Sequence, residues 1–174
     1  MSKENIILTG FMGCGKTTVG SLLAKKLNYV FIDTDQLIEK RCGISIREIF
    51  AAKGEKAFRE MESDIANELG TRDSLVVSTG GGLMLNPNNV TALTASGRVF
   101  CLIATPEEIL ARIAPDNESC RPLLKGSDPL KRIEEMITER DRSYKQFSQI
   151  DTSGRTPEEV ADYLVSIFQS QQDG

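Results

Sequence analysis

Short apolar runs alternate along this chain with longer segments that have helical spacing. The apolar runs predict strands near residues 5–9, 29–32, 74–78, 98–103 and 148–151. Apolar residues that recur at intervals of three and four predict helices near 16–27, 34–41, 45–69, 87–95, 106–113, 128–146 and 156–169. Because strands and helices alternate, we expect an α/β fold around a parallel sheet, with ligands at the carboxyl ends of the strands.

A glycine-rich loop joins the first predicted strand to the first predicted helix. Residues 10–17 read Gly-Phe-Met-Gly-Cys-Gly-Lys-Thr and fit the pattern G-x-x-x-x-G-K-[ST]. In such a loop successive backbone N–H groups surround phosphates, Lys16 adds a positive charge, and the Thr17 hydroxyl can ligate Mg²⁺. The order strand, loop, helix also places a helix N-terminus at the phosphates. The motif therefore predicts a nucleotide site.

Residues 114–128 interrupt the regular pattern. The segment is polar, contains Pro and Gly, and separates two strong helical patterns. It is either a surface loop or a mobile lid over the nucleotide. We favour the lid because it contains Arg121 and because phosphoryl transfer requires that water be excluded. No repeat or linker marks a boundary elsewhere, so we expect one domain over residues 1–174.

Charged residues occur in pairs at two places after the loop. Asp33 and Asp35 end the second predicted strand. They are either helix caps, or one holds the Mg²⁺ shell while the other accepts a proton from a substrate hydroxyl. Arg59 and Glu62, at i and i+3 on a predicted helix, form either a surface pair or a clamp in which Glu62 orients Arg59 toward a substrate carboxylate.

Two further segments are candidates for ligand contacts, one through backbone N–H groups and the other through arginine side chains. Gly80, Gly81 and Gly82 follow an apolar strand and leave room for the close approach of a ligand to backbone N–H groups. Arg140 and Arg142 lie on a helix that carries charges of both signs. That helix presents either a solvated face alone or one arginine in a site, because the two side chains point in different directions.

The composition limits the class of protein. The chain has 174 residues, of which 40% are hydrophobic and 26% charged, as in ordinary globular domains. A net charge of −4 argues against a general nucleic-acid-binding role. No apolar stretch has membrane-spanning length and the first residues do not resemble a signal peptide, so we expect a cytoplasmic protein without membrane contact. Histidine is absent, which leaves proton transfer to a carboxylate, Lys, Tyr or Cys.

Together, these motifs resemble those of the shikimate kinase family of small P-loop kinases, over residues 5–168. The motifs that carry the resemblance are Gly10–Thr18, Asp33-Thr34-Asp35, Phe58-Arg59-Glu60-Met61-Glu62, Ser78–Gly82, Arg121-Pro122-Leu123-Leu124 and Glu139-Arg140-Asp141-Arg142-Ser143-Tyr144. The resemblance implies a fold similar to nucleoside monophosphate kinases, with a five-stranded parallel sheet of order 2-3-1-4-5 between helices. It implies ATP-dependent phosphorylation of the shikimate 3-hydroxyl, which gives shikimate 3-phosphate and ADP on the route to chorismate and the aromatic amino acids. It also implies a monomer with one Mg²⁺ per subunit and a substrate-binding helical region over about 34–69.

The resemblance also assigns roles to individual residues. The nucleotide phosphates would contact Gly13, Cys14, Gly15, Lys16, Thr17 and Thr18. Thr17 and Asp33 would hold Mg²⁺, Asp33 through water, while Lys16 would follow the transferred group. Asp35 would bind the shikimate hydroxyls and act as the base, and the shikimate carboxylate and ring would meet Arg59, Gly80, Gly81, Gly82 and Arg140. Arg121 would reach the phosphates from the lid, and Arg112 and Arg155 would flank the adenine.

Two other functions fit part of this pattern. Another small-molecule P-loop kinase, acting on gluconate or a nucleoside monophosphate, would need donors other than Arg59 and Arg140 around Asp35. A GTP-dependent switch protein would carry an N-K-x-D guanine motif, which this sequence lacks. Shikimate phosphorylation therefore remains the prediction.

Overall fold

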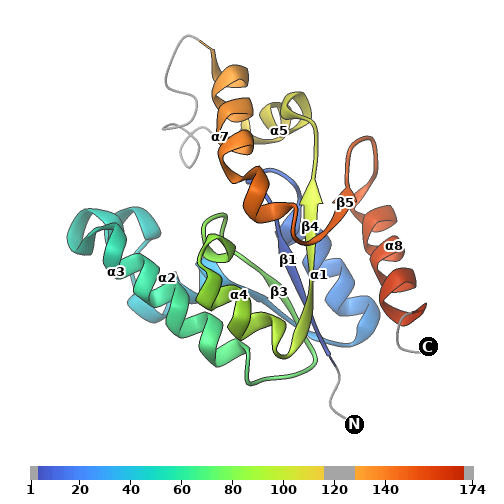
Figure 1. Ribbon diagram of the computed structural model, residues 1–174, viewed down its shortest axis with the longest axis horizontal. Coiled ribbons are helices and arrows are strands. Elements are labelled where there is room, and N and C mark those ends of the chain that lie inside the picture. Colours follow the sequence, from blue (N-terminus) through green and yellow to red (C-terminus); the bar gives the residue numbers. More distant parts are fainter. Residues whose placement is uncertain (1–3, 116–127, 171–174) are drawn as a thin grey trace.

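A parallel five-stranded sheet forms the centre of the computed structural model, which describes residues 4–115 and 128–170 (Figure 1). The strands are β1 (Asn5–Thr9), β2 (Val30–Asp33), β3 (Leu75–Ser78), β4 (Gly97–Ile103) and β5 (Ser148–Asp151). Their order is β2-β3-β1-β4-β5, and every neighbouring pair is parallel. The predicted fold class and strand order are confirmed.

Helices cover both faces of this sheet. They are α1 (Lys16–Leu27), α2 (Thr34–Cys42), α3 (Ile46–Leu69), α4 (Pro87–Thr94), α5 (Pro106–Ile113), α7 (Pro129–Tyr144) and α8 (Pro157–Ser170), with a short 3-10 helix η1 (Leu83–Leu85) after β3. Figure 1 shows α2, α3 and α4 grouped on one side, while α1 and α8 lie together on the other. All of these helices except η1 correspond to helices predicted from the apolar spacing.

The sheet separates two hydrophobic cores. Successive side chains of a strand point to opposite faces, so in β1 Ile6 and Leu8 enter one core while Ile7 enters the other. The first core receives apolar residues of α1 and α8, and the second receives those of α2, α3 and α4. Because both faces are covered, the central strands read as continuous apolar runs in the sequence.

The structure departs from the predicted elements within the long helix α3. Its helical conformation is interrupted at Gly54, which has φ 80° and ψ 171°. Only glycine adopts this backbone conformation readily, because it lacks a Cβ atom. A Cβ at this position would meet no other atom within 4 Å, so the conformation, not the space, calls for glycine. The apolar spacing continues across the interruption, which explains why the sequence predicted one helix.

The expected lid over about 114–128 falls almost entirely outside the described residues, as do Cys120 and Arg121. Among the described cysteines, Cys14, Cys42 and Cys101 are free thiols. In the described ranges, the helices are too short or too polar to span a membrane.

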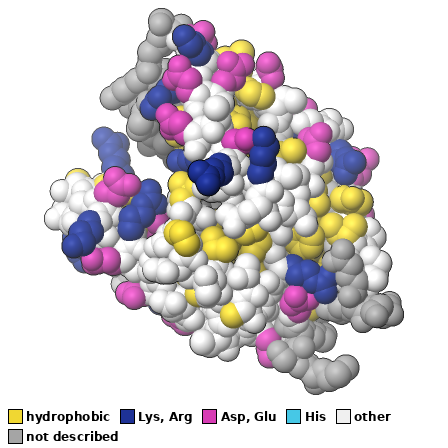
Figure 2. Space-filling model, in the orientation of Figure 1, with side chains coloured by type: hydrophobic (Ala, Val, Ile, Leu, Met, Phe, Trp, Pro, Cys, Tyr) yellow, Lys and Arg dark blue, Asp and Glu magenta, His cyan; other side chains and the backbone are white. Residues whose placement is uncertain are grey.

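Charged side chains of both signs are interspersed on the face of the molecule shown in Figure 2, and hydrophobic side chains form a band near its middle. This face therefore offers a ligand no strong field of one polarity.

Candidate active site

The glycine-rich loop connects β1 to α1 and folds tightly around the Lys16 side chain. Lys16 Nζ donates hydrogen bonds to the carbonyl oxygens of Gly10, at 2.8 Å, and Phe11, at 2.9 Å. Gly15, the residue before α1, has φ 90°, a conformation that favours glycine. Burial lowers the pKa of Lys16, whereas Cys14, Asp35 and Asp33 oppose this shift. The ammonium group is thus held inside the loop by groups that a phosphate could replace.

Asp33 joins the loop to the end of β2. One of its carboxylate oxygens accepts a hydrogen bond from Thr17 Oγ1 at 2.8 Å. The other accepts the backbone N–H groups of Asp35, at 3.1 Å, and Gln36, at 3.2 Å, and so caps helix α2. Asp33 can therefore cap helix α2 and also contribute to a Mg²⁺ site, because capping uses only one of its carboxylate oxygens.

Asp35 is the least satisfied carboxylate in the site. Its Oδ1 atom is buried and accepts no hydrogen bond within the described part of the chain. The pKa of Asp35 is raised to about 6, chiefly by burial and also by the charges of Asp33 and Glu62, while Lys16 acts to lower it. Such a carboxylate is suited to accept a proton or a hydrogen bond from a ligand hydroxyl.

We expect Asp35→Asn to be more stable than the wild type at neutral pH. The folded pKa of about 6 lies above the ordinary value of 3.8, so the folded state binds more protons between these values and loses stability as pH rises through that window. The full shift corresponds to roughly 3 kcal/mol, and partial exposure reduces the expected gain to about 1–2 kcal/mol, or a Tm rise of about 3–6 °C. Thermal unfolding without nucleotide or Mg²⁺ measures it. The difference should grow from about pH 4 to pH 7, and a constant difference would contradict the assignment.

Gly80, Gly81 and Gly82 form a glycine turn after β3, and side chains from other segments lie close to its backbone. A Cβ atom at Gly80 would overlap Asp35 Oδ1, and one at Gly82 would overlap the Arg59 guanidinium. Glycine at these two positions therefore permits the Asp35 carboxylate and the Arg59 guanidinium to approach the same stretch of backbone.

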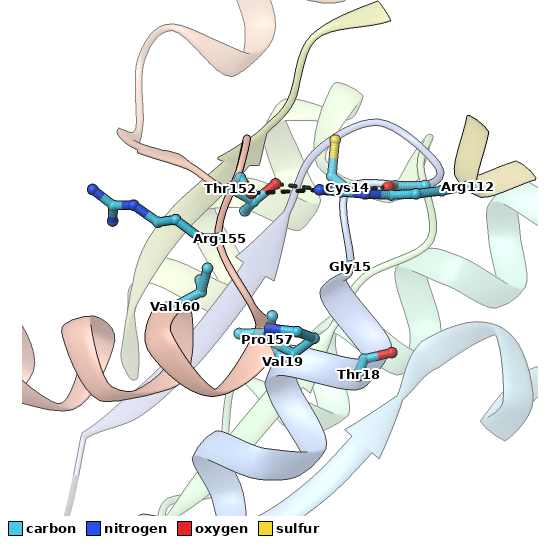
Figure 3. A pocket seen from close by; sticks show the side chains of 10 residues that line it. Cys14, Gly15, Thr18, Val19, Arg112, Thr152, Arg155, Pro157 and Val160 are labelled. Atoms are coloured by element: carbon cyan, nitrogen blue, oxygen red, sulfur yellow. Dashed lines mark hydrogen bonds between the residues drawn. The ribbon is translucent and has the colours of Figure 1, made fainter. Parts of the chain in front are cut away.

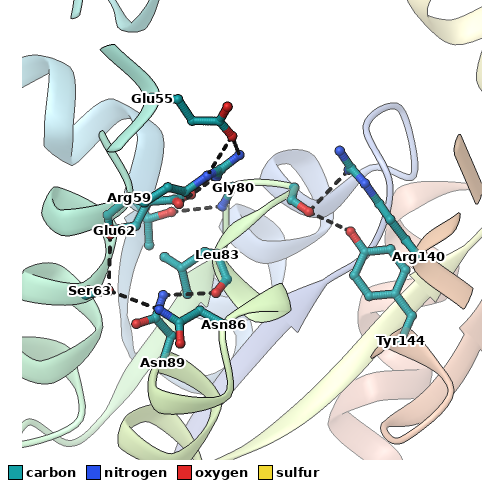
Figure 4. A network of polar contacts seen from close by, with 12 residues as sticks. Glu55, Arg59, Glu62, Ser63, Gly80, Leu83, Asn86, Asn89, Arg140 and Tyr144 are labelled. Atoms are coloured by element: carbon teal, nitrogen blue, oxygen red, sulfur yellow. Dashed lines mark hydrogen bonds and ion pairs between the residues drawn. The ribbon is translucent and has the colours of Figure 1, made fainter. Parts of the chain in front are cut away.

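Arg59 is held by two carboxylates on its own helix (Figure 4). Its Nη1 donates to Glu62 Oε2 at 2.7 Å and its Nη2 to Glu55 Oε1 at 3.1 Å. Glu62 is only 1% exposed, and this burial raises its pKa while Arg59 lowers it. Glu62 thus orients Arg59, as expected from the i, i+3 spacing, whereas the contact with exposed Glu55 is weak and replaceable.

Arg140 reaches the same glycine turn from α7. Its Nη1 donates to the Gly81 carbonyl at 3.2 Å, and its guanidinium lies 5.5 Å from the ring centroid of Phe11. Arg142 is exposed to solvent. Of Arg140 and Arg142, only Arg140 lines the site, as expected from their different directions on the helix.

Six of the residues predicted to bind the nucleotide line a cavity of about 350 Å³ (Figure 3). Its walls are Gly13, Cys14, Gly15, Thr18, Val19, Arg112, Thr152, Arg155, Pro157 and Val160. Arg112 donates to the Gly13 carbonyl at 3.1 Å and to Thr152 Oγ1 at 3.2 Å, which ties α5 to the loop after β5. The Arg155 side chain extends away from the P-loop and places its guanidinium 5.4 Å from the Tyr163 ring centroid.

A second cavity of about 350 Å³ lies on the other side of the P-loop. It is lined by Met12, Gly13, Gly15, Lys16, Thr17, Thr18, Asp33, Asp35, Ser78, Thr79, Gly80, Gly81 and Arg140. Gly13, Gly15 and Thr18 line both cavities, so the P-loop is their common wall. Of the residues predicted to bind shikimate, Arg59 and Gly82 do not line this cavity. The site therefore has two compartments, and Lys16 and Asp35 lie together in the second.

Two contributors were given no role from the sequence. Thr152 is 3% exposed and bonds Arg112, and Tyr144 is 7% exposed and donates to the Gly81 carbonyl. The spacing of Tyr144 four residues after Arg140 is a sequence signal for a shared helix face. For Thr152 the only sequence signal is its position directly after the last strand, at the edge of the sheet where ligands bind in such folds.

Comparisons with known proteins agree with this arrangement. Residues 12–169 match the sequence profile of the family described as shikimate kinase. A shikimate kinase of Caldanaerobacter subterraneus subsp. tengcongensis is 44% identical over 166 residues, 95% of this chain and 96% of that protein. A shikimate kinase of Geobacter sulfurreducens is 43% identical over 170 residues, which cover 97% of this chain and 93% of that protein.

Solved structures agree as well. The Acinetobacter baumannii shikimate kinase in complex with shikimate has a TM-score of 0.88 and 35% identity, covering 97% of this chain and 94% of that one. A gluconokinase from Sinorhizobium meliloti, with a TM-score of 0.61 and 16% identity, shares the fold alone. With a matching profile over most of its length and close relatives over nearly all of it, this chain belongs to the shikimate kinase family.

Proposed function

We propose that this protein transfers the γ-phosphoryl group of ATP to the 3-hydroxyl of shikimate, giving shikimate 3-phosphate and ADP. The observation that carries this proposal is the position of Asp35. Its carboxylate, whose Oδ1 atom accepts no hydrogen bond from the described residues, lines the same cavity as Lys16 and the P-loop, and that cavity shares a wall with the cavity beside Arg112 and Thr152. A proton acceptor and a phosphate-binding cation therefore meet where two substrates can be brought together.

On the donor side, the P-loop provides the phosphate contacts. Phosphoryl oxygens would replace the Gly10 and Phe11 carbonyls as acceptors for Lys16 Nζ, which now lies 2.8 and 2.9 Å from them. Lys16 would then stay with the γ-phosphoryl group as it moves. Arg112, fixed to Gly13 and Thr152, would form one wall for the nucleotide base, and Arg155 would lie beyond it.

Mg²⁺ suits the donor set at the loop. Thr17 Oγ1 and Asp33 Oδ2, joined by a 2.8 Å hydrogen bond, offer a hydroxyl and a carboxylate beside the phosphates. In the described residues, groups of three or more potential metal-binding side chains are absent. Mg²⁺ in kinases needs no such group, because it keeps several waters and binds through few carboxylates plus substrate phosphates. When bound, it neutralises charge on the phosphates.

On the acceptor side, the residues match an anion that carries hydroxyl groups. Asp35 would accept the proton of the attacking hydroxyl, and its raised pKa makes it a stronger base than an ordinary carboxylate. Arg140 and Arg59, which converge on the glycine turn, would bind the shikimate carboxylate. The Gly81 backbone N–H would donate to the substrate. Arg121 lies outside the described residues, and its role at the phosphates stays a prediction.

An assay that measures ADP formation with different acceptors tests this proposal directly. We expect turnover with ATP and shikimate, and turnover at least about 100-fold lower with gluconate or nucleoside monophosphates at equal concentration, because these acceptors present different groups to Asp35 and the two arginines. Omission of the acceptor measures the background hydrolysis of ATP. Equal or greater activity with another acceptor would overturn the proposed function.

A further inference from the structure

The Gly81 carbonyl is the meeting point of two side chains from α7. Tyr144 Oη donates to it at 2.7 Å and Arg140 Nη1 at 3.2 Å, and Figure 4 shows the two bonds converging on one oxygen. A carbonyl oxygen has two lone pairs, so these two donors use its full capacity. The peptide between Gly81 and Gly82 is thereby held at one orientation, which also fixes the direction of the Gly82 N–H.

Tyr144 is the more rigid of the two donors. It is 7% exposed and ends α7, and its own carbonyl accepts hydrogen bonds from Gln149 Nε2 at 2.8 Å and from the Phe147 N–H at 3.1 Å. Burial raises the pKa of the Tyr144 phenol, so it stays protonated and acts as a donor. Arg140, four residues earlier on the same helix face, has a longer and more flexible side chain.

Phe11 also contacts Arg140. Its ring is 3% exposed and lies 5.5 Å from the Arg140 guanidinium carbon, within the range of a cation–π contact. Phe11 belongs to the P-loop, and its carbonyl binds Lys16 Nζ. Arg140 is therefore set between the donor-side loop and the glycine turn that Tyr144 fixes.

Resting on the proposed function, we propose that Tyr144 is a positioning residue of the acceptor site. It fixes the Gly81 carbonyl and, through this shared acceptor, the Arg140 guanidinium at the point where Arg140 binds the acceptor carboxylate. Its hydroxyl proton is already committed to Gly81, so Tyr144 acts through these groups and contributes no reacting atom. Its loss should therefore change acceptor binding more than the rate of the chemical step.

Tyr144→Phe removes the hydroxyl and keeps the buried ring. We expect the KM for shikimate to rise roughly 5-fold, the size expected for one net hydrogen bond, with kcat and the KM for ATP within about 2-fold. The matched control is Tyr163→Phe, because Tyr163 is 45% exposed on α8, and we expect no change there. An unchanged shikimate KM in Tyr144→Phe, or an equal fall in kcat, would overturn the inference.

A second measurement separates positioning from general loosening of the fold. With the methyl ester of shikimate, which has no carboxylate for Arg140, we expect Tyr144→Phe to change KM by less than about 2-fold. In an Arg140→Ala background, Tyr144→Phe should have no additional effect on shikimate KM. Equal losses with acid and ester, or additive losses in the double variant, would contradict action through Arg140.

A second variant covers the case in which Tyr144→Phe does not fold. Phe11→Leu keeps an apolar side chain but removes the ring beneath Arg140, and we expect shikimate KM to rise roughly 3-fold while thermal unfolding confirms a folded protein. An unchanged KM in this variant would count against the inference. A wild type that does not phosphorylate shikimate would instead refute the proposed function, so the two failures are distinguishable.

Discussion

Asp35→Asn is expected to lower kcat for shikimate phosphorylation by about 10²–10⁴-fold, the usual contribution of a general base. The asparagine has almost the same shape, so it fills the same space beside Gly80. It cannot take up a proton, and this sequence has no histidine that could substitute for it. The P-loop contacts of Lys16 do not involve Asp35, so ATP affinity should stay within about 2-fold.

Single-turnover kinetics with saturating ATP and shikimate would measure this loss directly. Asp64→Asn is the matched control, because Asp64 is an exposed aspartate on α3 outside both site cavities, and its kcat should be that of the wild type. Equilibrium binding of an ATP analogue would verify that the nucleotide site is intact. If Asp35→Asn retained turnover within a few fold of the wild type, the base would have to be sought elsewhere.

Much of this fold follows from local patterns in the sequence. The strands are short apolar runs, and the helices begin at residues that cap them, such as Ser45, whose side chain and Glu48 form a capping box at the start of α3. Helix α5 likewise begins at Pro106, directly after its N-cap residue Thr105. The P-loop could be placed because its motif needs a strand before it and a helix after it. The strand order, by contrast, came from the family resemblance, since non-local pairing leaves no local pattern.

The remaining features depend either on a single backbone conformation or on contacts between distant segments. The interruption at Gly54 is a property of one backbone conformation, which the apolar spacing does not record. The role of Tyr144 depends on an acceptor at Gly81, 63 residues away, and that of Thr152 on Arg112, 40 residues away. Side chains that act through a backbone carbonyl leave little trace in residue type, because many polar side chains can donate to a carbonyl.

The glycine turn shows how the sequence and the structure complement each other. The three glycines indicated close approach, without indicating what approaches. The structure identifies the neighbours as Asp35 at Gly80, Arg140 at Gly81 and Arg59 at Gly82. One carboxylate and two guanidinium groups from three different helices are thus packed against consecutive residues, an arrangement that suits the proposed ligand with its hydroxyls and one carboxylate.

Arg59→Ala is expected to raise the KM for shikimate by about 100-fold and to leave the KM for ATP nearly unchanged. The loss of two charge-assisted hydrogen bonds to the substrate carboxylate accounts for an effect of this size. In the structure the guanidinium is shared by Glu62 at 2.7 Å and Glu55 at 3.1 Å, and the substrate would replace the exposed Glu55 contact while Glu62 keeps the fork oriented. Arg59→Lys should recover only part of the loss, because an ammonium group cannot bind a carboxylate in the two-point geometry of arginine.

Steady-state kinetics with shikimate and ATP varied in turn would separate the two effects. Arg41→Ala is the matched control, since Arg41 on α2 also pairs with a glutamate of α3, Glu68, at 2.7 Å but lines neither site cavity. Its shikimate KM should equal that of the wild type. Arg59→Ala also leaves Glu62 buried without its partner, so a lower Tm is expected in that variant, and Arg59→Ala/Glu62→Gln should recover stability without recovering shikimate binding. Unchanged shikimate affinity in folded Arg59→Ala would assign the carboxylate to Arg140 alone.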